Sequence, residues 1–183
     1  MHETSLNGTV ADYLTGEARE RTTYEDLRQA LAKFLVEDRG YCASLLQPRH
    51  TVAYSVDNTP YERQADIAVF CSSGLLGMLV VFCSGQVHTY MREVMSLSRL
   101  ALPYPSPLAV VTDMRAAELF AVKDGSILAE GLSALPPPET MEVLANLHAH
   151  PPLRAGQRDK ESRILHAYSG FLKSCCIENC PPG

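Results

Sequence analysis

Asp66 stands at the head of an apolar run, Ile67–Cys71, where a carboxylate is out of place unless it has a role. A second apolar run, Met78–Cys83, follows after a short turn that contains glycine, so the two runs predict a β-hairpin. Such an acid is either one half of a reactive site or a structural side chain at a strand end, paired with a cation such as Arg63. The pattern is compatible with both hypotheses.

A second group of potential ligands lies near the end of the sequence. Cys175, Cys176 and Cys180 follow His166, and thiolates together with imidazole are typical zinc ligands. We expect either a zinc site there or a cysteine-containing tail without metal. In contrast, Cys71 lies within an apolar run and is expected to be a buried small hydrophobic residue.

The composition is that of an ordinary soluble globular protein, with 183 residues, 46% hydrophobic and 20% charged. The net charge of −5 argues against strong, sequence-independent binding to nucleic acid, although a local basic patch is compatible with it. The longest apolar stretches are far shorter than a membrane span, and the first ten residues have no apolar signal core. We therefore expect a cytoplasmic protein without a membrane partner.

The elements that would position Asp66 can be predicted from periodicity and turn signals. Thr22 and Thr23 open a helix with capping-box spacing, and an apolar stripe continues it until Gly40. Strands are expected at 51–56, in the hairpin, and at 108–111, 118–122 and 126–128, and further helices at 89–100, 139–147 and 158–173. This order predicts an α/β (or α+β) domain with a mixed sheet of five or six strands.

Three regions follow from breaks in composition. Residues 1–21 are polar and predict an N-terminal arm, residues 22–135 contain the predicted sheet, and residues 136–183 form a helical extension with the cysteine tail. The triple proline at 136–138 marks the second boundary.

Four stretches together resemble a known family: TTYEDLRQALAKFLVEDRGY, QADIAVF, GMLVVF and PLAVVTDMRAAELFAV. They are similar to the N-terminal domain of type I restriction enzyme R proteins, over roughly Thr15–Leu132. The resemblance rests on the order of elements and on anchors such as Glu25, Arg28 and Asp66. It implies the restriction-endonuclease-like fold of the PD-(D/E)xK nucleases.

In active members of that fold, an acid on the first hairpin strand and a Glu-x-Lys on the second hold Mg²⁺ and orient the attacking water. Asp66 matches the acid, but the Glu-x-Lys falls on Phe82-Cys83-Ser84. Phe82 has no oxygen ligand to offer, and Ser84 cannot supply the positive charge of the lysine. The resemblance therefore implies a nuclease fold whose catalytic centre is lost, with Asp66, Glu25, Phe82 and Ser84 as its vestiges.

Three functional hypotheses follow. The first is an inactive nuclease-fold module that binds nucleic acid or a protein, without a cofactor, with Arg28, Arg63 and Arg92 as candidate binding residues. The second is a Mg²⁺-dependent nuclease with relocated ligands, drawn from the acids nearest Asp66 in sequence or on the first helix, which are Glu25, Glu62 and Glu93. The third is a homodimeric interaction protein with a zinc site at the C-terminal cysteines.

Overall fold

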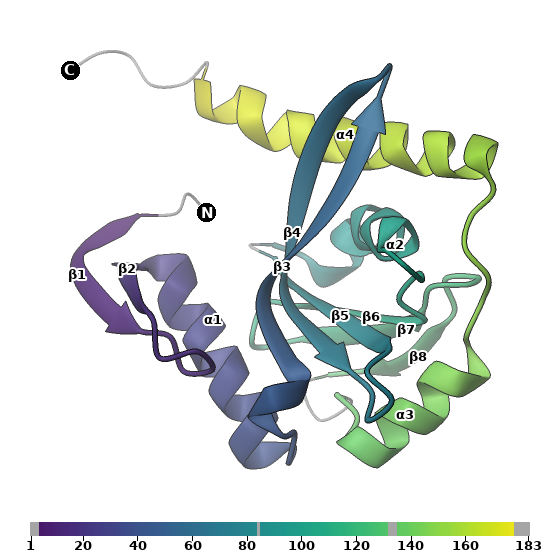
Figure 1. Cartoon of the computed structure of the whole chain (residues 1–183). Coiled ribbons are helices and arrows are strands. Elements are labelled where there is room, and N and C mark those ends of the chain that lie inside the picture. Colours follow the sequence, from purple (N-terminus) through teal and green to yellow (C-terminus); the bar gives the residue numbers. More distant parts are fainter. Residues whose placement is uncertain (1–3, 84, 132–134, 178–183) are drawn as a thin grey trace.

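The computed structural model describes residues 4–83, 85–131 and 135–177, with residues 170–177 described by their backbone alone. A six-stranded mixed sheet forms its centre, with the strands in sequence order from β3 to β8 (Figure 1). All neighbouring strands are antiparallel except β5 and β6, which are parallel and joined through helix α2. The prediction of an α/β domain with a mixed sheet of five or six strands is confirmed.

The central hairpin is formed by β4 (Thr59–Phe70) and β5 (Leu76–Phe82), as the two apolar runs predict. The other strands of the sheet are β3 (Leu46–Val56), β6 (Leu108–Thr112), β7 (Ala117–Ala121) and β8 (Ile127–Glu130). Strand β3 begins before the predicted position and runs through Pro48, which pairs with Ile67. Proline is tolerated there because β3 is an edge strand of this sheet.

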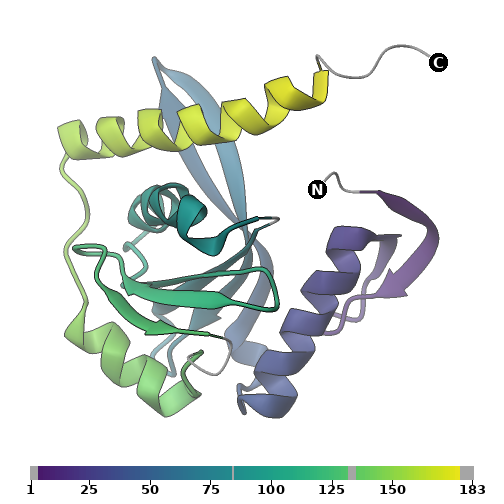
Figure 2. The same ribbon diagram turned by 180° about the vertical axis from the view of Figure 1, so that it is seen from behind.

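Helices cover both faces of the sheet (Figure 2). On one face, α1 (Thr23–Lys33) and α3 (Pro138–Leu147) pack on a core that includes Ile67, Met78 and Val80. On the other face, α2 (Met91–Leu100) and α4 (Ala155–Ile177) pack on a core that includes Leu79 and Val81. Neighbouring residues of β5 therefore belong to opposite cores, as the two-residue period of a strand requires.

The N-terminal segment, predicted as a polar arm, contains a separate two-stranded sheet. Strands β1 (Ser5–Ala11) and β2 (Ala18–Thr22) pair antiparallel, and β2 leads directly into α1. Thr22 ends β2 and caps α1, because its side chain accepts a hydrogen bond from the Glu25 N–H at 3.0 Å. This junction fixes where the first turn of α1 lies relative to the central sheet.

Two glycines lie at positions where the fold disfavours a side chain. Gly40 has a φ of +79° just after the short π-helix Phe34–Asp38 that extends α1, and this conformation favours glycine. Gly77 lies in β5 beneath α3, where a Cβ atom would come within 2.6 Å of the Met141 sulfur. A glycine at position 77 therefore lets α3 pack closely on the sheet.

Candidate functional site

Asp66 lies in β4 with both carboxylate oxygens engaged. Its Oδ1 accepts hydrogen bonds from Arg28 Nε and Nη2 at 3.1 and 3.0 Å, and its Oδ2 accepts one from the backbone N–H of Phe82 at 2.7 Å. The Asp66 side chain is 14% exposed. The partner of Asp66 is thus Arg28 on α1 and not Arg63, which the sequence suggested as a possible partner.

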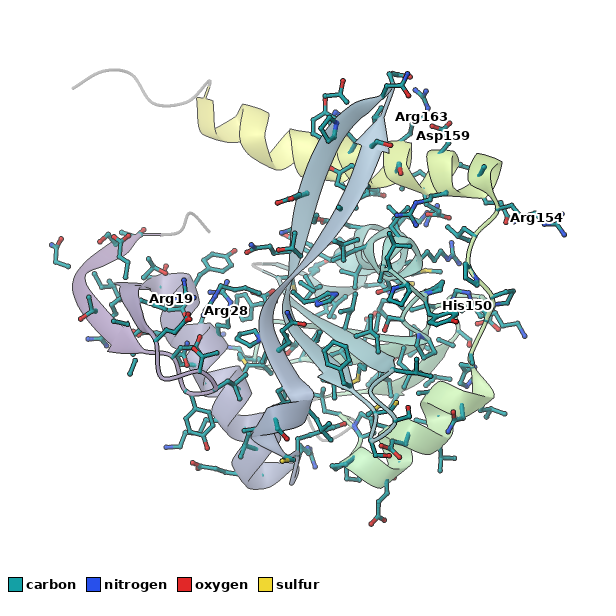
Figure 3. The ribbon with its side chains drawn as sticks, in the orientation of Figure 1. Arg19, Arg28, His150, Arg154, Asp159 and Arg163 are labelled. Atoms are coloured by element: carbon teal, nitrogen blue, oxygen red, sulfur yellow. The ribbon has the colours of Figure 1, made fainter. Side chains whose placement is uncertain are left out.

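Arg28 joins Asp66 to a second acid, Glu25, one turn earlier on α1. In Figure 3, Arg28 lies between α1 and the strands β3 and β4. Burial opposes the charge of Arg28, but the nearby carboxylates of Asp66 and Glu25 outweigh this and raise the pKa of its guanidinium. Glu25 is buried although it lies in the first turn of α1.

The network continues to residues that the sequence did not single out. Arg49 on β3 donates to Glu25 at 2.9 Å and also pairs with Asp12, which is buried after β1. Gln29 of α1 donates to Glu25. Burial opposes ionisation of Asp12, but hydrogen bonds from Arg49 and from backbone N–H groups of the following turn outweigh it and lower the pKa of Asp12.

Arg49 has an unusual backbone conformation within β3. Its φ is +52°, and it falls between the regular pairs Pro48–Ile67 and His50–Ala65. A positive φ is uncommon for a residue other than glycine and persists where the surroundings hold it. The unusual backbone of Arg49 thus lies opposite the Asp66 position of β4.

Phe82, where the resemblance implies the glutamate of a Glu-x-Lys, lies beside Asp66 and makes an aromatic contact. The ring of Phe82 packs edge-on against Tyr24 of α1, with 5.5 Å between the ring centroids. Ser84 lies outside the described residues. This donor set does not fit Mg²⁺, because Phe82 contributes no oxygen and the two nearby acids, Glu25 and Asp66, share the guanidinium of Arg28.

The other residues considered for a relocated site are engaged elsewhere or face solvent. Glu93 is buried and pairs with Arg63 at 3.0 Å, and Arg92 pairs with Glu161 at 2.9 Å. Glu62 is exposed on β4. Within the described ranges, no group of three His, Cys, Asp or Glu side chains is placed to hold a metal ion.

Of the predicted zinc ligands near the C-terminus, the structure describes the side chain of His166 alone. The side chains of Cys175 and Cys176, and the whole of Cys180, lie outside the described part of the chain. His166 packs against the ring of Tyr61, with 4.4 Å between centroids. A zinc site at the cysteines therefore stays a prediction.

An open hollow of about 570 Å³ lies beside the network. Glu25, Arg28 and Arg49 line it, together with Arg19 and Glu20 of β2 and Gln64 of β4. The side chain of Arg19 is 42% exposed and pairs with Glu17. The hollow therefore presents guanidinium groups to solvent beside the pair of Arg28 and Asp66.

The sequence matches the family described as "Type I restriction enzyme R protein N terminus (HSDR_N)" over residues 23–136. This match covers more than half of the chain, and the protein belongs to that family. Among curated proteins, no sequence matches this chain. The type IIG restriction endonuclease BpuSI is a structural neighbour, with 12% identity and a TM-score of 0.39 over 87% of this chain and 17% of that chain.

The present chain thus spans less than a fifth of the BpuSI chain. In the described part of the molecule, no helix has both the length and the apolar character needed to cross a membrane.

Proposed function

We propose that this protein is a catalytically inactive nuclease-fold domain that acts as a binding module. The observation that carries the proposal is the state of Asp66, whose two oxygens are used by Arg28 and by the Phe82 N–H. A metal-dependent nuclease needs carboxylates that are free to bind a hard cation. Here the positive charge between the two acids, Asp66 and Glu25, is the guanidinium of Arg28.

Nucleic acid is the ligand that the hollow beside Asp66 suits. Guanidinium groups pair with phosphate through forked hydrogen bonds, and amide side chains such as that of Gln64 add further donors. Arg19, Arg28 and Arg49 all pair with carboxylates, but Arg19 is 42% exposed while Arg28 and Arg49 are 15% and 17% exposed, so Arg19 carries most of the contact in this proposal. The acidic balance of the whole chain makes such binding weak and salt-dependent.

Fluorescence anisotropy with a labelled DNA duplex tests the binding proposal. Arg19→Gln should raise the dissociation constant about threefold to tenfold at low salt, because one phosphate contact is lost. Arg21→Gln is the matched control, since Arg21 lies on the same strand, is similarly exposed, and pairs with Asp26 away from the hollow. If Arg19→Gln and Arg21→Gln have equal dissociation constants for the duplex, or if the native protein does not bind it, nucleic acid is rejected as the ligand of this hollow.

A metal-dependent nuclease with relocated ligands is the second candidate. It is favoured by one observation, that Glu25 and Asp66 contact the same guanidinium and so lie close to each other. This candidate requires Arg28 to release both acids when a metal arrives. Cleavage of DNA that depends on Mg²⁺ or Mn²⁺ and is abolished by Asp66→Ala would establish it.

A further inference from the structure

A second polar hollow, of about 300 Å³, lies away from the Asp66 network. It is formed by α2, the turn between β7 and β8, the segment between α3 and α4, and α4 itself, and its polar lining includes Arg99, Lys123, His150, Gln157, Lys160 and Glu161. Figure 3 shows His150 on the opposite side of the molecule from Arg19 and Arg28. The two hollows are therefore separate sites.

This second hollow is positively charged. Its acid, Glu161, pairs with Arg92 and Arg99, which donate to it at 2.9 Å each, and it accepts a hydrogen bond from the Ser96 hydroxyl. Lys123 and Lys160 are exposed and form no ion pair with any described residue. The ammonium groups of Lys123 and Lys160 thus give the hollow a net positive charge, because the carboxylate of Glu161 is already paired with two arginines.

Arg99 is held rigidly at the wall of this hollow. Its Nε and Nη2 donate to the Val122 carbonyl at 3.1 and 2.9 Å, while Nη1 donates to Glu161. A guanidinium has five N–H groups, so Nη1 retains a second hydrogen for a ligand. A fixed cation of this kind binds an anion without having to lose much side-chain freedom.

His150 lines this hollow and also a neighbouring apolar one of about 170 Å³. Its Nδ1 lies 3.2 Å from the Pro151 carbonyl oxygen, which can only accept, so Nδ1 carries the hydrogen of that bond. Its Nε2 is buried and has no hydrogen-bond partner among the described residues. A buried polar atom without a partner is costly and points to a group that arrives from outside.

The apolar hollow is suited to binding a flat aromatic ring. Tyr104, Leu76, Pro105 and Pro107 are among its lining residues, and Tyr104 is 55% exposed. An accessible tyrosine ring beside proline and leucine side chains offers a stacking surface for a base. The apolar and cationic hollows adjoin at His150.

We propose that these two hollows form one binding site for a nucleotide, with the base against Tyr104 and the phosphates between Arg99, Lys123 and Lys160. The unpartnered Nε2 of His150 lies at the junction and bonds to a polar group of the nucleotide. Free nucleotides and the phosphorylated end of a nucleic-acid strand share this chemistry. The site differs in residues and position from the Asp66 hollow, so its failure leaves the proposed function untouched.

Isothermal titration calorimetry of the full chain with ATP, AMP, adenosine and pyrophosphate tests the site. The double variant Lys123→Gln/Lys160→Gln should weaken ATP binding about a hundredfold, at about tenfold for each of the two lost charge-assisted bonds. Both lysines are exposed, so folding is preserved. Lys33→Gln is the control, because Lys33 is an exposed lysine of α1 that does not line the hollow.

A second variant tests the base contact separately. Tyr104→Ala should weaken ATP binding about tenfold and leave pyrophosphate binding unchanged, because only the nucleotide stacks. Stronger binding of a 5′-phosphorylated oligonucleotide than of ATP would identify a strand end as the ligand. Stronger binding of ATP than of the oligonucleotide would identify a free nucleotide. Undetectable ATP binding, unchanged ATP binding in the double lysine variant, or equal affinities for pyrophosphate and ATP would overturn the proposal.

Discussion

The guanidinium of Arg28 donates two hydrogen bonds, at 3.1 and 3.0 Å, to a single oxygen of Asp66, across 38 positions of sequence. The other Asp66 oxygen is held by the next strand. Both oxygens of Asp66 therefore accept hydrogen bonds from within the protein, and neither is free to bind a metal. This arrangement makes Arg28 the internal counter-ion of the site, and the stability of the domain should depend on it.

Replacing Arg28 with alanine should lower the free energy of unfolding by about 3 kcal/mol, because a buried pair that loses one partner leaves an uncompensated charge. Both Asp66 and Glu25 lose a partner in this variant. Urea unfolding followed by circular dichroism measures the change. Arg21→Ala, which breaks the exposed pair with Asp26, should cost less than about 1 kcal/mol. Equal losses for the two variants would contradict a special role for Arg28.

The missing ligands can be put back by substitution. The variant Phe82→Glu/Ser84→Lys supplies the two residue types that the family has at these positions, and we expect it to bind Mn²⁺ weakly at best while Arg28 holds Asp66. Adding Arg28→Ala should free Asp66 and Glu25 and create measurable Mn²⁺ binding by calorimetry. If the variant that retains Arg28 binds Mn²⁺ as tightly as the triple variant, Arg28 does not block the site.

The stability of the N-terminal hairpin contacts should depend on pH through Asp12. Its pKa is lowered from the ordinary value of 3.8, so the ionised form is favoured by folding. Its contribution is therefore complete above about pH 4 and is lost as the pH falls through the lower, folded-state pKa. Asp12→Asn should cost about 1–3 kcal/mol at pH 7, and this difference from the native protein should shrink toward pH 3. A difference that is the same at both pH values would refute the assignment.

The described thiols should differ in reactivity. Hydrogen bonds from Ser44 lower the pKa of Cys42, which is exposed. Burial raises the pKa of Cys71 and of Cys83. Because the thiolate is the reactive form, alkylation resolved by peptide mass spectrometry should modify Cys42 well before Cys71 and Cys83 in the folded protein. Comparable rates at all three positions would show that the two apolar-run cysteines are accessible.

The parts of this fold that depend on local signals could be predicted from the sequence. The capping threonine of α1, the apolar runs of β4 and β5, and the Asp-Gly turn before β8 each act over a few residues. The start of β3 could not be predicted in this way. The sequence predicts a strand only from residue 51, whereas Pro48 already lies within β3. Proline is tolerated there because β3 is at the edge of the sheet, and that place depends on the order of the strands in space.

The site itself could be predicted only in part. The resemblance singled out Asp66, Glu25, Arg28 and the substituted Phe82, and the structure brings these together. Asp12 and Arg49 are 37 positions apart, and no spacing rule links them. Their contact depends on the N-terminal hairpin and on the positive φ of Arg49, and neither feature leaves a periodic signal in the sequence.

The measurement that tests the central claim most directly is a cleavage assay. The purified chain is incubated with plasmid and single-stranded DNA in Mg²⁺ and in Mn²⁺, beside the Asp66→Ala variant as a control for contaminating nuclease. With Asp66 held by Arg28 and by the Phe82 N–H, we predict that native protein and variant leave the DNA equally intact. Metal-dependent cleavage by the native protein that disappears in Asp66→Ala would contradict the account.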